Sequence, residues 1–385
     1  MNTRERFLAV MNFDANVTPP KWEFGYWASA VRRWYAEGLP RRVGLSDAIP
    51  DGEGVTGPGL AWRRDRPRDQ DVLAACALDE GMERVPINIL FCPVFRDEIL
   101  EDHGDWVVRR DSEGVVRRER RDRNSLPRFV GWPVQSRDDW ERLKAERLRP
   151  TLEGRFLCDW PKEKARLRSR TFPLAIGGSQ GFYGTPRALL GEENHLMGFH
   201  DNPDLIKTLI NDLCDFWIAL FDRVLNEIDV DLALVWEDMS YKTGSLISPA
   251  MVREFMLPAY KKITAFYRDR GIKIILLDTD GQCSSLIPVF LDGGITGLYP
   301  FEVNAGMDVV EVRKAFPALQ MLGGINKMAV AAGPADIDAE LAARAPALQR
   351  GGYIPFIDHY VPPDVSWSHF TYYRRRLTGL IETSV

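Results

Sequence analysis

From residue 172 onward, short apolar runs of strand length alternate with helical patterns. Such runs, bounded by turn residues, are typical of strands buried on both faces of a parallel sheet. The helix that begins at Asn202-Pro203 keeps a helical period through Phe221. The alternation predicts parallel βαβ units. Six strands are expected after residue 172, within the segments 172–177, 232–238, 274–278, 297–302, 319–326 and 353–359.

With one or two further strands before residue 172, the pattern predicts a single α/β domain over residues 1–385, a (β/α)₈ TIM barrel. A short helix at 3–13, capped by Thr3, opens an N-terminal extension, and residues 86–95 are a candidate strand. Two alternating segments surround the turn Asp111-Ser-Glu-Gly114, which predicts a β-hairpin insertion at about residues 104–120. The run Arg63–Arg68 contains Asp65 and is followed by Asp69, which favours a solvated face over a phosphate site.

Composition excludes several classes of function. The net charge of −5, with 27% charged residues of both signs, argues against nucleic acid or an anionic membrane as partner. No run of about 18 apolar residues and no apolar leader are found, so we expect a cytoplasmic protein. The five cysteines are scattered without a Cys-x-x-Cys, which excludes a cysteine-rich zinc site. A small-molecule substrate is expected, and a homodimer is left open.

Candidate chemistry centres on the strand Ile274–Leu277, which ends in Asp278-Thr-Asp280-Gly281. Residues i and i+2 of an extended chain point the same way, so both carboxylates should project from the strand end together. Two adjacent like charges are costly to bury, and a simple turn would not need both. The pair therefore indicates a functional site at the carboxyl end of a barrel strand.

Most of the other predicted strands also end in polar or acidic residues, and in a barrel these ends share one face. Capping of the next helix explains Asp238 or Asp358 equally well when each is taken alone. His359 could be a structural histidine, and Lys327 could lie on the surface. Their coincidence favours a site. The set comprises Glu23, Tyr26, Trp27, Gln180, Tyr183, Glu237, Asp238, Tyr241, Lys242, Asp278, Asp280, Glu302, Asn326, Lys327, Asp358 and His359.

Two chemistries suit such a face. In the first, Glu237, one of the two aspartates, Glu302 and His359 hold a divalent metal that acts as a Lewis acid. Zinc, manganese or iron would fit such a ligand set. In the second, no metal is involved: a carboxylate positions a proton, while lysines and His359 bind an acidic substrate. Serine hydrolase and dinucleotide-binding motifs are absent from the sequence.

The chain resembles the uroporphyrinogen decarboxylase superfamily over nearly its full length. The resemblance rests on Arg4–Met11, the segment Ile247–Lys261, Leu276–Gly281, and the glycine-containing segments Gly323–Lys327 and Gly351–Pro355. It implies a (β/α)₈ barrel with its cleft at the carboxyl ends of the strands.

Within the superfamily, the true decarboxylases need no cofactor and carry an N-terminal Arg-Gln-Ala-Gly-Arg-Tyr motif for substrate carboxylates. Here Trp22-Glu-Phe-Gly-Tyr-Trp27 stands in that region, which argues against a tetrapyrrole with many carboxylates. The cobamide-dependent methyltransferases bind zinc through His-x-Cys-Gly and a later Cys. Here these places read Asp278-Thr-Asp280-Gly281 and Asp358-His359, so the resemblance implies an oxygen or nitrogen substrate rather than a thiol.

We therefore predict an enzyme that demethylates a methoxylated or methylated small molecule and passes the methyl group to a corrinoid protein, with zinc assistance. Two alternatives are a cofactor-free decarboxylase-like enzyme and a non-catalytic binding barrel. The predicted catalytic residues, which are also the zinc ligands, are Glu237, Asp278, Asp280 and His359. The predicted substrate-binding residues are Trp22, Glu23, Tyr26, Trp27, Gln180, Tyr183, Tyr241, Lys242, Glu302 and Lys327.

Overall fold

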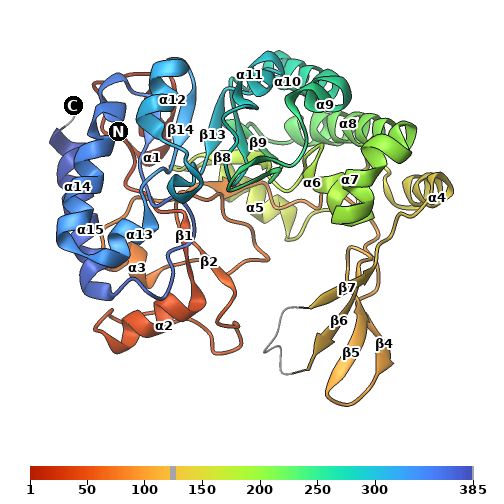
Figure 1. The fold of residues 1–385 in the computed structure, drawn as a ribbon, viewed down its shortest axis with the longest axis horizontal. Helices are drawn as coiled ribbons and strands as arrows, with labels where there is room; N and C mark the ends of the chain where they lie inside the picture. Colours follow the sequence, from red (N-terminus) through yellow and green to blue (C-terminus); the bar gives the residue numbers. More distant parts are fainter. Residues whose placement is uncertain (122–126, 384–385) are drawn as a thin grey trace.

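A parallel sheet forms the centre of the computed structural model, which describes residues 1–121 and 127–383 (Figure 1). Within these residues seven strands pair in the order in which they occur along the chain, as a TIM-like barrel requires. All six strands predicted after residue 172 are confirmed. The strands are β3 (Glu83–Arg84), β8 (Leu174–Gly177), β9 (Leu232–Trp236), β12 (Ile274–Asp278), β13 (Gly297–Tyr299), β14 (Gln320–Leu322) and β15 (Tyr353–Ile354).

Between the two edge strands, β15 and β3, the ring is completed by isolated parallel bridges rather than by a full ladder. Tyr26 pairs with Val361, and Trp62 pairs with Glu83. The N-terminal extension therefore supplies the eighth side of the barrel. Its own strands β1 (Gly25–Trp27) and β2 (Gly54–Thr56) pair antiparallel with each other.

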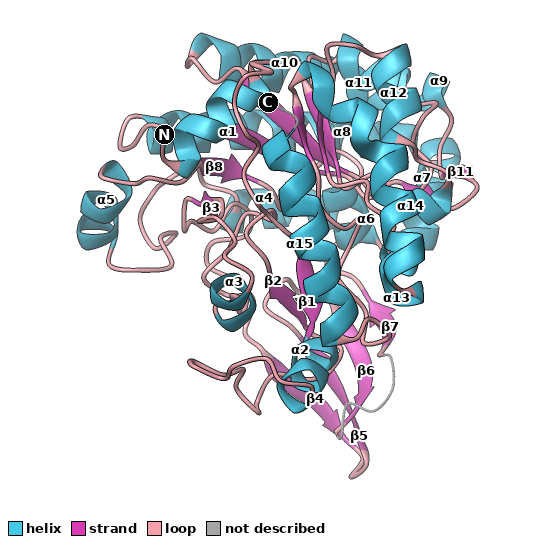
Figure 2. Cartoon of the chain, turned by 90° about the vertical axis from the view of Figure 1, so that its left-hand side faces the viewer, coloured by secondary structure: helices cyan, strands magenta, loops and turns pink. Residues whose placement is uncertain are grey.

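Helices cover the outside of the sheet, and α15 runs across it in Figure 2. In this layer α8 packs on α10, and α14 packs on α15. No helix among the described residues is long and apolar enough to cross a membrane. The helices after residue 136 are α4 (Arg137–Arg147), α5 (Trp160–Arg168), α6 (Gly184–Leu190), α7 (Glu192–Asp201), α8 (Pro203–Leu225), α9 (Pro249–Met251), α10 (Leu257–Asp269), α11 (Ile287–Asp292), α12 (Val309–Ala315), α13 (Lys327–Ala332), α14 (Pro334–Arg344) and α15 (Trp367–Thr383), with a π-helix at Val252–Met256 and 3₁₀ helices at Val303–Ala305 and Ala345–Arg350.

Strand β12 shows how the sequence positions the site. Ile275 and Leu277 pack into the core shared with the helices, whereas Ile274 and Leu276 belong to the inner cluster of the barrel. Because side chains alternate along a strand, Asp278 continues the inward-facing series. The carboxylate therefore faces the barrel axis at the carboxyl end of the strand.

The N-terminal extension closes the opposite end of the barrel. Helix α1 (Thr3–Met11) contributes Phe7 and Val10 to the inner cluster. Its cap is Asn2, whose side chain accepts the N–H of Glu5, so the prediction of Thr3 as cap is wrong by one residue. Two further short helices follow, α2 (Ala28–Ala36) and α3 (Asp71–Ala75).

The strand expected at residues 86–95 is not formed. Ile87 makes a single antiparallel bridge to Phe156, and strand β3 lies just before the segment. The apolar side chains of Ile87, Ile89 and Phe91 are buried in the main core all the same. Burial, rather than strand pairing, therefore explains the apolar run that suggested a strand.

The predicted hairpin insertion is confirmed but is larger than expected. Its two strands are the centre of a four-stranded antiparallel sheet that projects from the body as an arm (Figure 1). The turn between β5 and β6 contacts the segment before β4, where the N–H of Phe95 donates to the carbonyl of Ser112 at 3.0 Å. The strands are β4 (Glu98–Asp102), β5 (Trp106–Arg110), β6 (Val116–Arg120) and β7 (Arg128–Gly131).

Candidate active site

A cavity of about 510 Å³ lies at the carboxyl ends of β9 and β12, a size typical of small-molecule sites. The N-terminal extension supplies much of its wall and the loop after β15 supplies another part. Besides Glu53, Glu113 and several small or aliphatic residues, its wall contains three acid–base residues, three arginines and four aromatic residues. These are Asp278, Asp280 and His359; Arg63, Arg66 and Arg84; and Phe24, Trp27, Trp236 and Tyr360.

The two aspartates face the same cavity, as their i, i+2 spacing predicts. Burial, reinforced by the nearby Asp238 carboxylate, raises the pKa of Asp278 to about 7. Burial and then the charge of Asp278 raise the pKa of Asp280 well above its usual value. The Oδ1 atom of Asp280 has no hydrogen-bond partner among the described residues. Near neutral pH, the pair therefore holds at least one proton that can be donated into the cavity.

His359 lies beside this pair. Its Nε2 is 3.6 Å from Oδ2 of Asp280, and its ring stacks on Phe24 with centroids 5.3 Å apart. Burial, and next the charge of Lys327, lower the pKa of His359 to about 4. The imidazole is therefore neutral at neutral pH and can accept a proton or hold one on a single nitrogen.

Of the three arginines in the described cavity wall, Arg84 alone forms no ion pair with a described carboxylate. One of its terminal nitrogens donates to the carbonyl of Gly178, and its Nε has no partner among the described residues. A Cβ at Gly178, where φ is +93°, would lie 2.6 Å from Cζ of Arg84, so glycine permits this close approach. Arg84 is thus built into the wall with donors left for a ligand.

Arg63 and Arg66 also line the cavity, although Arg64, Asp65 and Arg66 are exposed, as predicted for a solvated face. Nε of Arg63 donates to Asp65 at 2.8 Å, and Arg66 pairs with Glu53. These partners reduce the net positive charge that both arginines bring. The cavity nevertheless carries cations next to protonated acids, which is an arrangement suited to carboxylate groups.

Glu237 does not face the cavity, contrary to its predicted catalytic and metal-binding roles. Its buried carboxylate accepts the N–H groups of Phe182, Tyr183 and Gly184 and the hydroxyl of Tyr260 at 2.6 Å. Burial raises its pKa. These four donors occupy the carboxylate, which holds the turn that leads into α6.

Several predicted substrate-binding residues are structural. Trp22 is buried and donates from Nε1 to the carbonyl of Glu80. Glu23 forms a buried ion pair with Arg374. The side chain of Gln180 bonds to the backbone at Leu234 and Gly178. Among the described residues of the predicted binding set, only Trp27 lines the cavity.

The remaining aromatic and charged predictions divide between core and surface. Tyr26 is part of the core, and the hydroxyl of the buried Tyr183 donates to Glu192 at 3.0 Å. Tyr241 is 60% exposed on the small hairpin of β10 (Ser240–Tyr241) and β11 (Gly244–Ser245). Lys242 follows it in the same hairpin. None of these four side chains contributes to the described cavity wall.

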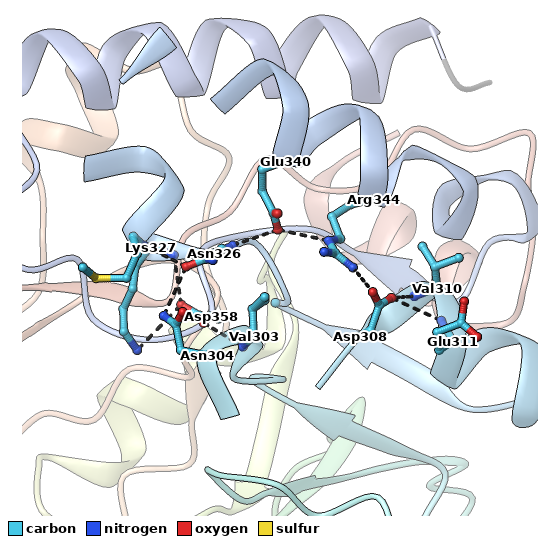
Figure 3. A network of polar contacts seen from close by, with 12 residues as sticks. Val303, Asn304, Asp308, Val310, Glu311, Asn326, Lys327, Glu340, Arg344 and Asp358 are labelled. Atoms are coloured by element: carbon cyan, nitrogen blue, oxygen red, sulfur yellow. Dashed lines mark hydrogen bonds and ion pairs between the residues drawn. The ribbon is translucent and has the colours of Figure 1, made fainter. Parts of the chain in front are cut away.

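Glu302 and Lys327 act on the loop that carries Asp280. Figure 3 shows the network around Lys327 and Asp358 that joins the loops after β13, β14 and β15. Nζ of Lys327 lies 3.2 Å from Glu302 and 3.8 Å from Asp358. The other oxygen of Glu302 accepts the N–H of Gly281 at 3.0 Å. Both residues thereby fix the position of the Asp280 loop instead of lining the cavity.

The residues present do not fit the predicted zinc site. Glu237 is fully engaged elsewhere, and of the other predicted ligands His359 lies 3.6 Å from Asp280. No group of three or more His, Cys, Asp and Glu side chains there has an arrangement that could hold a metal ion. Arginines share the cavity, which further disfavours a cation.

Sequence reasoning missed Arg84, Trp236 and Tyr360 as cavity residues. Arg84 ends strand β3, so it could have been found by the same strand-end argument had that short strand been recognised. Trp236 ends β9 and directly precedes Glu237. Tyr360 follows His359, and its ring packs 5.0 Å from that of Trp27.

The raised pKa of Asp278 predicts a pH-dependent stability. In the unfolded chain an aspartate has a pKa near 4, and here it is about 7. Between these values the unfolded chain releases a proton that the folded protein retains, so stability falls as pH rises from about 4 to 7 and stays low above. We expect Asp278→Asn to raise the free energy of unfolding at pH 8 by about 1 to 4 kcal/mol and to leave it unchanged at pH 4.

Urea unfolding at both pH values measures this effect. Asp47→Asn is the matched control, because the Asp47 side chain is 96% exposed. A variant no more stable than the parent at pH 8 would contradict the burial of a protonated Asp278.

The comparisons with known proteins agree with the fold. The family model for uroporphyrinogen decarboxylase (URO-D) matches residues 165–375. A methyltransferase from Methanosarcina mazei has a similar structure, with a TM-score of 0.53 and 13% identity, covering 100% of this chain and 99% of that one. A vitamin-B12-independent methionine synthase from Listeria monocytogenes reaches a TM-score of only 0.22 at 12% identity, over 46% of this chain and 69% of that one, and adds nothing to the assignment. No curated protein matches the sequence.

Proposed function

The chain belongs to the uroporphyrinogen decarboxylase family, and on that premise we propose that it is a cofactor-free carboxy-lyase for a small carboxylic acid. The observation that carries the proposal is the shared cavity of Arg84, with unpaired donors, and the two aspartates with raised pKa. The cavity volume of about 510 Å³ suits a small acid.

In the proposed reaction Arg84 orients the substrate carboxylate by charge-assisted hydrogen bonds. The bond between the carboxylate carbon and its neighbour breaks, carbon dioxide leaves, and the electron pair stays on the neighbouring carbon. The protonated aspartate, in our proposal Asp280, donates its proton to that carbon. Solvent then returns a proton to the carboxylate, and neutral His359 at 3.6 Å can relay it.

Residues 22–27 lack the arginines that the true decarboxylases use for substrate carboxylates. Here the cations reach the cavity from other segments, at Arg63, Arg66 and Arg84. Two of the three are already paired with carboxylates of this chain, which favours a substrate with few carboxylates over a tetrapyrrole with many.

A panel of aromatic and aliphatic carboxylic acids, together with uroporphyrinogen, tests the proposal. Purified protein without added cofactor should release labelled carbon dioxide from at least one small acid, and mass spectrometry should show the product with one solvent-derived hydrogen. Release from no acid in the panel between pH 5 and 8 would speak against a carboxy-lyase.

For the acid found in this way, we expect Arg84→Met to lower kcat/KM by about 10- to 100-fold, because a charge-assisted hydrogen bond contributes about 1.5 to 3 kcal/mol. Steady-state kinetics measures the effect. Arg41→Met is the control, since the Arg41 side chain is 58% exposed and is not part of the cavity wall. Equal kinetics for both variants would remove Arg84 from the site.

Transfer of a methyl group to a corrinoid protein is a second candidate function. It is favoured by the aromatic wall of Phe24, Trp27, Trp236 and Tyr360, which suits a methoxylated ring. A fold shared along the whole chain with a methyltransferase supports it further. In this reaction Asp280 would protonate the heteroatom that loses its methyl group. Demethylation that requires an added corrinoid protein, without release of carbon dioxide, would favour this function over the first.

A further inference from the structure

A second, smaller cavity of about 260 Å³ adjoins the first. The two share Arg63, Arg84, Leu90, Glu113 and Ser179 as wall residues. Arg84 lines both cavities and therefore stands at their junction. The second cavity extends away from the aspartates, toward the base of the antiparallel arm.

The wall of the second cavity is mixed, with an apolar part beside the charged residues Arg63, Arg64, Asp65, Arg84 and Glu113. Its apolar side chains come from the irregular segment after β3 and from the loop before α5, namely Ile87, Ile89, Leu90, Phe91, Val94 and Leu157. The polar side chain among them, Asn88, is already satisfied. Its Nδ2 donates to the carbonyl of Phe91 at 2.6 Å, and its Oδ1 accepts the N–H of Leu90 at 3.0 Å. The six apolar side chains thus offer carbon surface to a ligand, beside the charged residues of the wall.

The arm contributes Ser112 and Glu113 to the wall, from the turn between β5 and β6. This turn is fixed by the bond from Phe95 to the Ser112 carbonyl. Gly114 lies directly on Phe95, because a Cβ there would approach its ring to 2.7 Å. The insertion is therefore held in place as a wall of the compartment and is not merely a projecting arm.

We propose that the two cavities form one bipartite site for an amphipathic carboxylate with an alkyl or arylalkyl chain. Arg84 binds the carboxylate at the junction, and the apolar chain fills the compartment of Ile87, Leu90 and Phe91. The turn at Ser112 and Glu113 closes that compartment and sets the length of chain that fits. This inference rests on the proposed function for the orientation of the carboxylate, and it names the class of substrate.

Calorimetric binding of butyrate, hexanoate and octanoate tests the inference. We expect the dissociation constant to fall by about fourfold for each added methylene that enters the compartment, since burial of one methylene contributes about 0.8 kcal/mol. Arg84→Met should weaken all three acids by 10-fold or more. An equal affinity for butyrate and octanoate, or an equally tight affinity for 1-octanol, would overturn the bipartite site.

Val94→Trp narrows the compartment without disturbing the core, because Val94 is 52% exposed. It should weaken octanoate by about 10-fold and leave butyrate unchanged. Val43→Trp is the matched control, since Val43 is 65% exposed and lies outside both cavities. Unchanged octanoate binding in Val94→Trp would also overturn the inference.

The carbon dioxide assay separates this inference from the proposed reaction. Length-dependent binding through Arg84 without release of carbon dioxide from any acid would contradict the carboxy-lyase and leave the bipartite site standing. Release of carbon dioxide from short acids, with no gain in affinity or kcat/KM for longer ones, would contradict the bipartite site alone.

Discussion

Replacement of Asp280 by Asn is expected to lower kcat by about 10²- to 10⁴-fold, the usual contribution of a positioned general acid. Asn keeps the shape of the carboxyl group but has no transferable proton. Asp280 is chosen because it lines the cavity and because its Oδ1 has no hydrogen-bond partner among the described residues. Burial and the charge of Asp278 also raise its pKa. Single-turnover kinetics on an acid from the panel measures the effect.

The pH profile of the parent enzyme supplies a second readout. Because the proposed acid must be protonated and burial raises the pKa of Asp280 well above its usual value, kcat should fall as pH rises through that raised pKa. Asp47→Asn should change neither kcat nor the profile. Full turnover by Asp280→Asn, with the parent's profile, would show that another group donates the proton.

Replacement of Glu23 by Ala should have the largest effect on stability, a loss of about 3 to 5 kcal/mol, because it leaves a buried charge without its partner. Oε1 of Glu23 lies 2.5 Å from Nη1 of Arg374. The other oxygen accepts the N–H of Ile357 at 3.2 Å. The pair joins the N-terminal extension to helix α15, so its loss opens the side of the barrel that isolated bridges close.

An exposed ion pair between the same two parts of the chain provides the control. Nζ of Lys21 lies 2.7 Å from Glu382, whose side chain is 53% exposed. Glu382→Ala should lower the free energy of unfolding by no more than about 1 kcal/mol, as is usual for exposed pairs. Urea unfolding compares the two variants, and similar losses in both would mean that Glu23 is not a structural residue.

The contrast between Asp280 and Glu23 shows the limit of strand-end reasoning. Both are acids placed by the sequence pattern on the same face of the barrel. One faces the cavity and the other is neutralised by Arg374, a residue that lies 351 positions further along the chain. No local pattern around Glu23 indicates that partner.

The sequence by itself determined the six later strands, the insertion and the direction of the two aspartates. These features follow from local periodicity, because alternation along β12 sends Ile274, Leu276 and Asp278 to the same side. The uroporphyrinogen decarboxylase resemblance, read from short motifs, was confirmed by the family match.

Which polar side chains come into contact depends on the tertiary structure. In the folded chain Glu237 accepts the N–H groups of residues 182–184, and Arg63, Arg66 and Arg84 line the cavity. The fold also raises the pKa of Asp278 by burying it near Asp238. Burial and long-range charge contacts depend on segments distant in the chain, so periodicity could locate the site at Asp278 and Asp280 but could not supply its arginines or its protonation state.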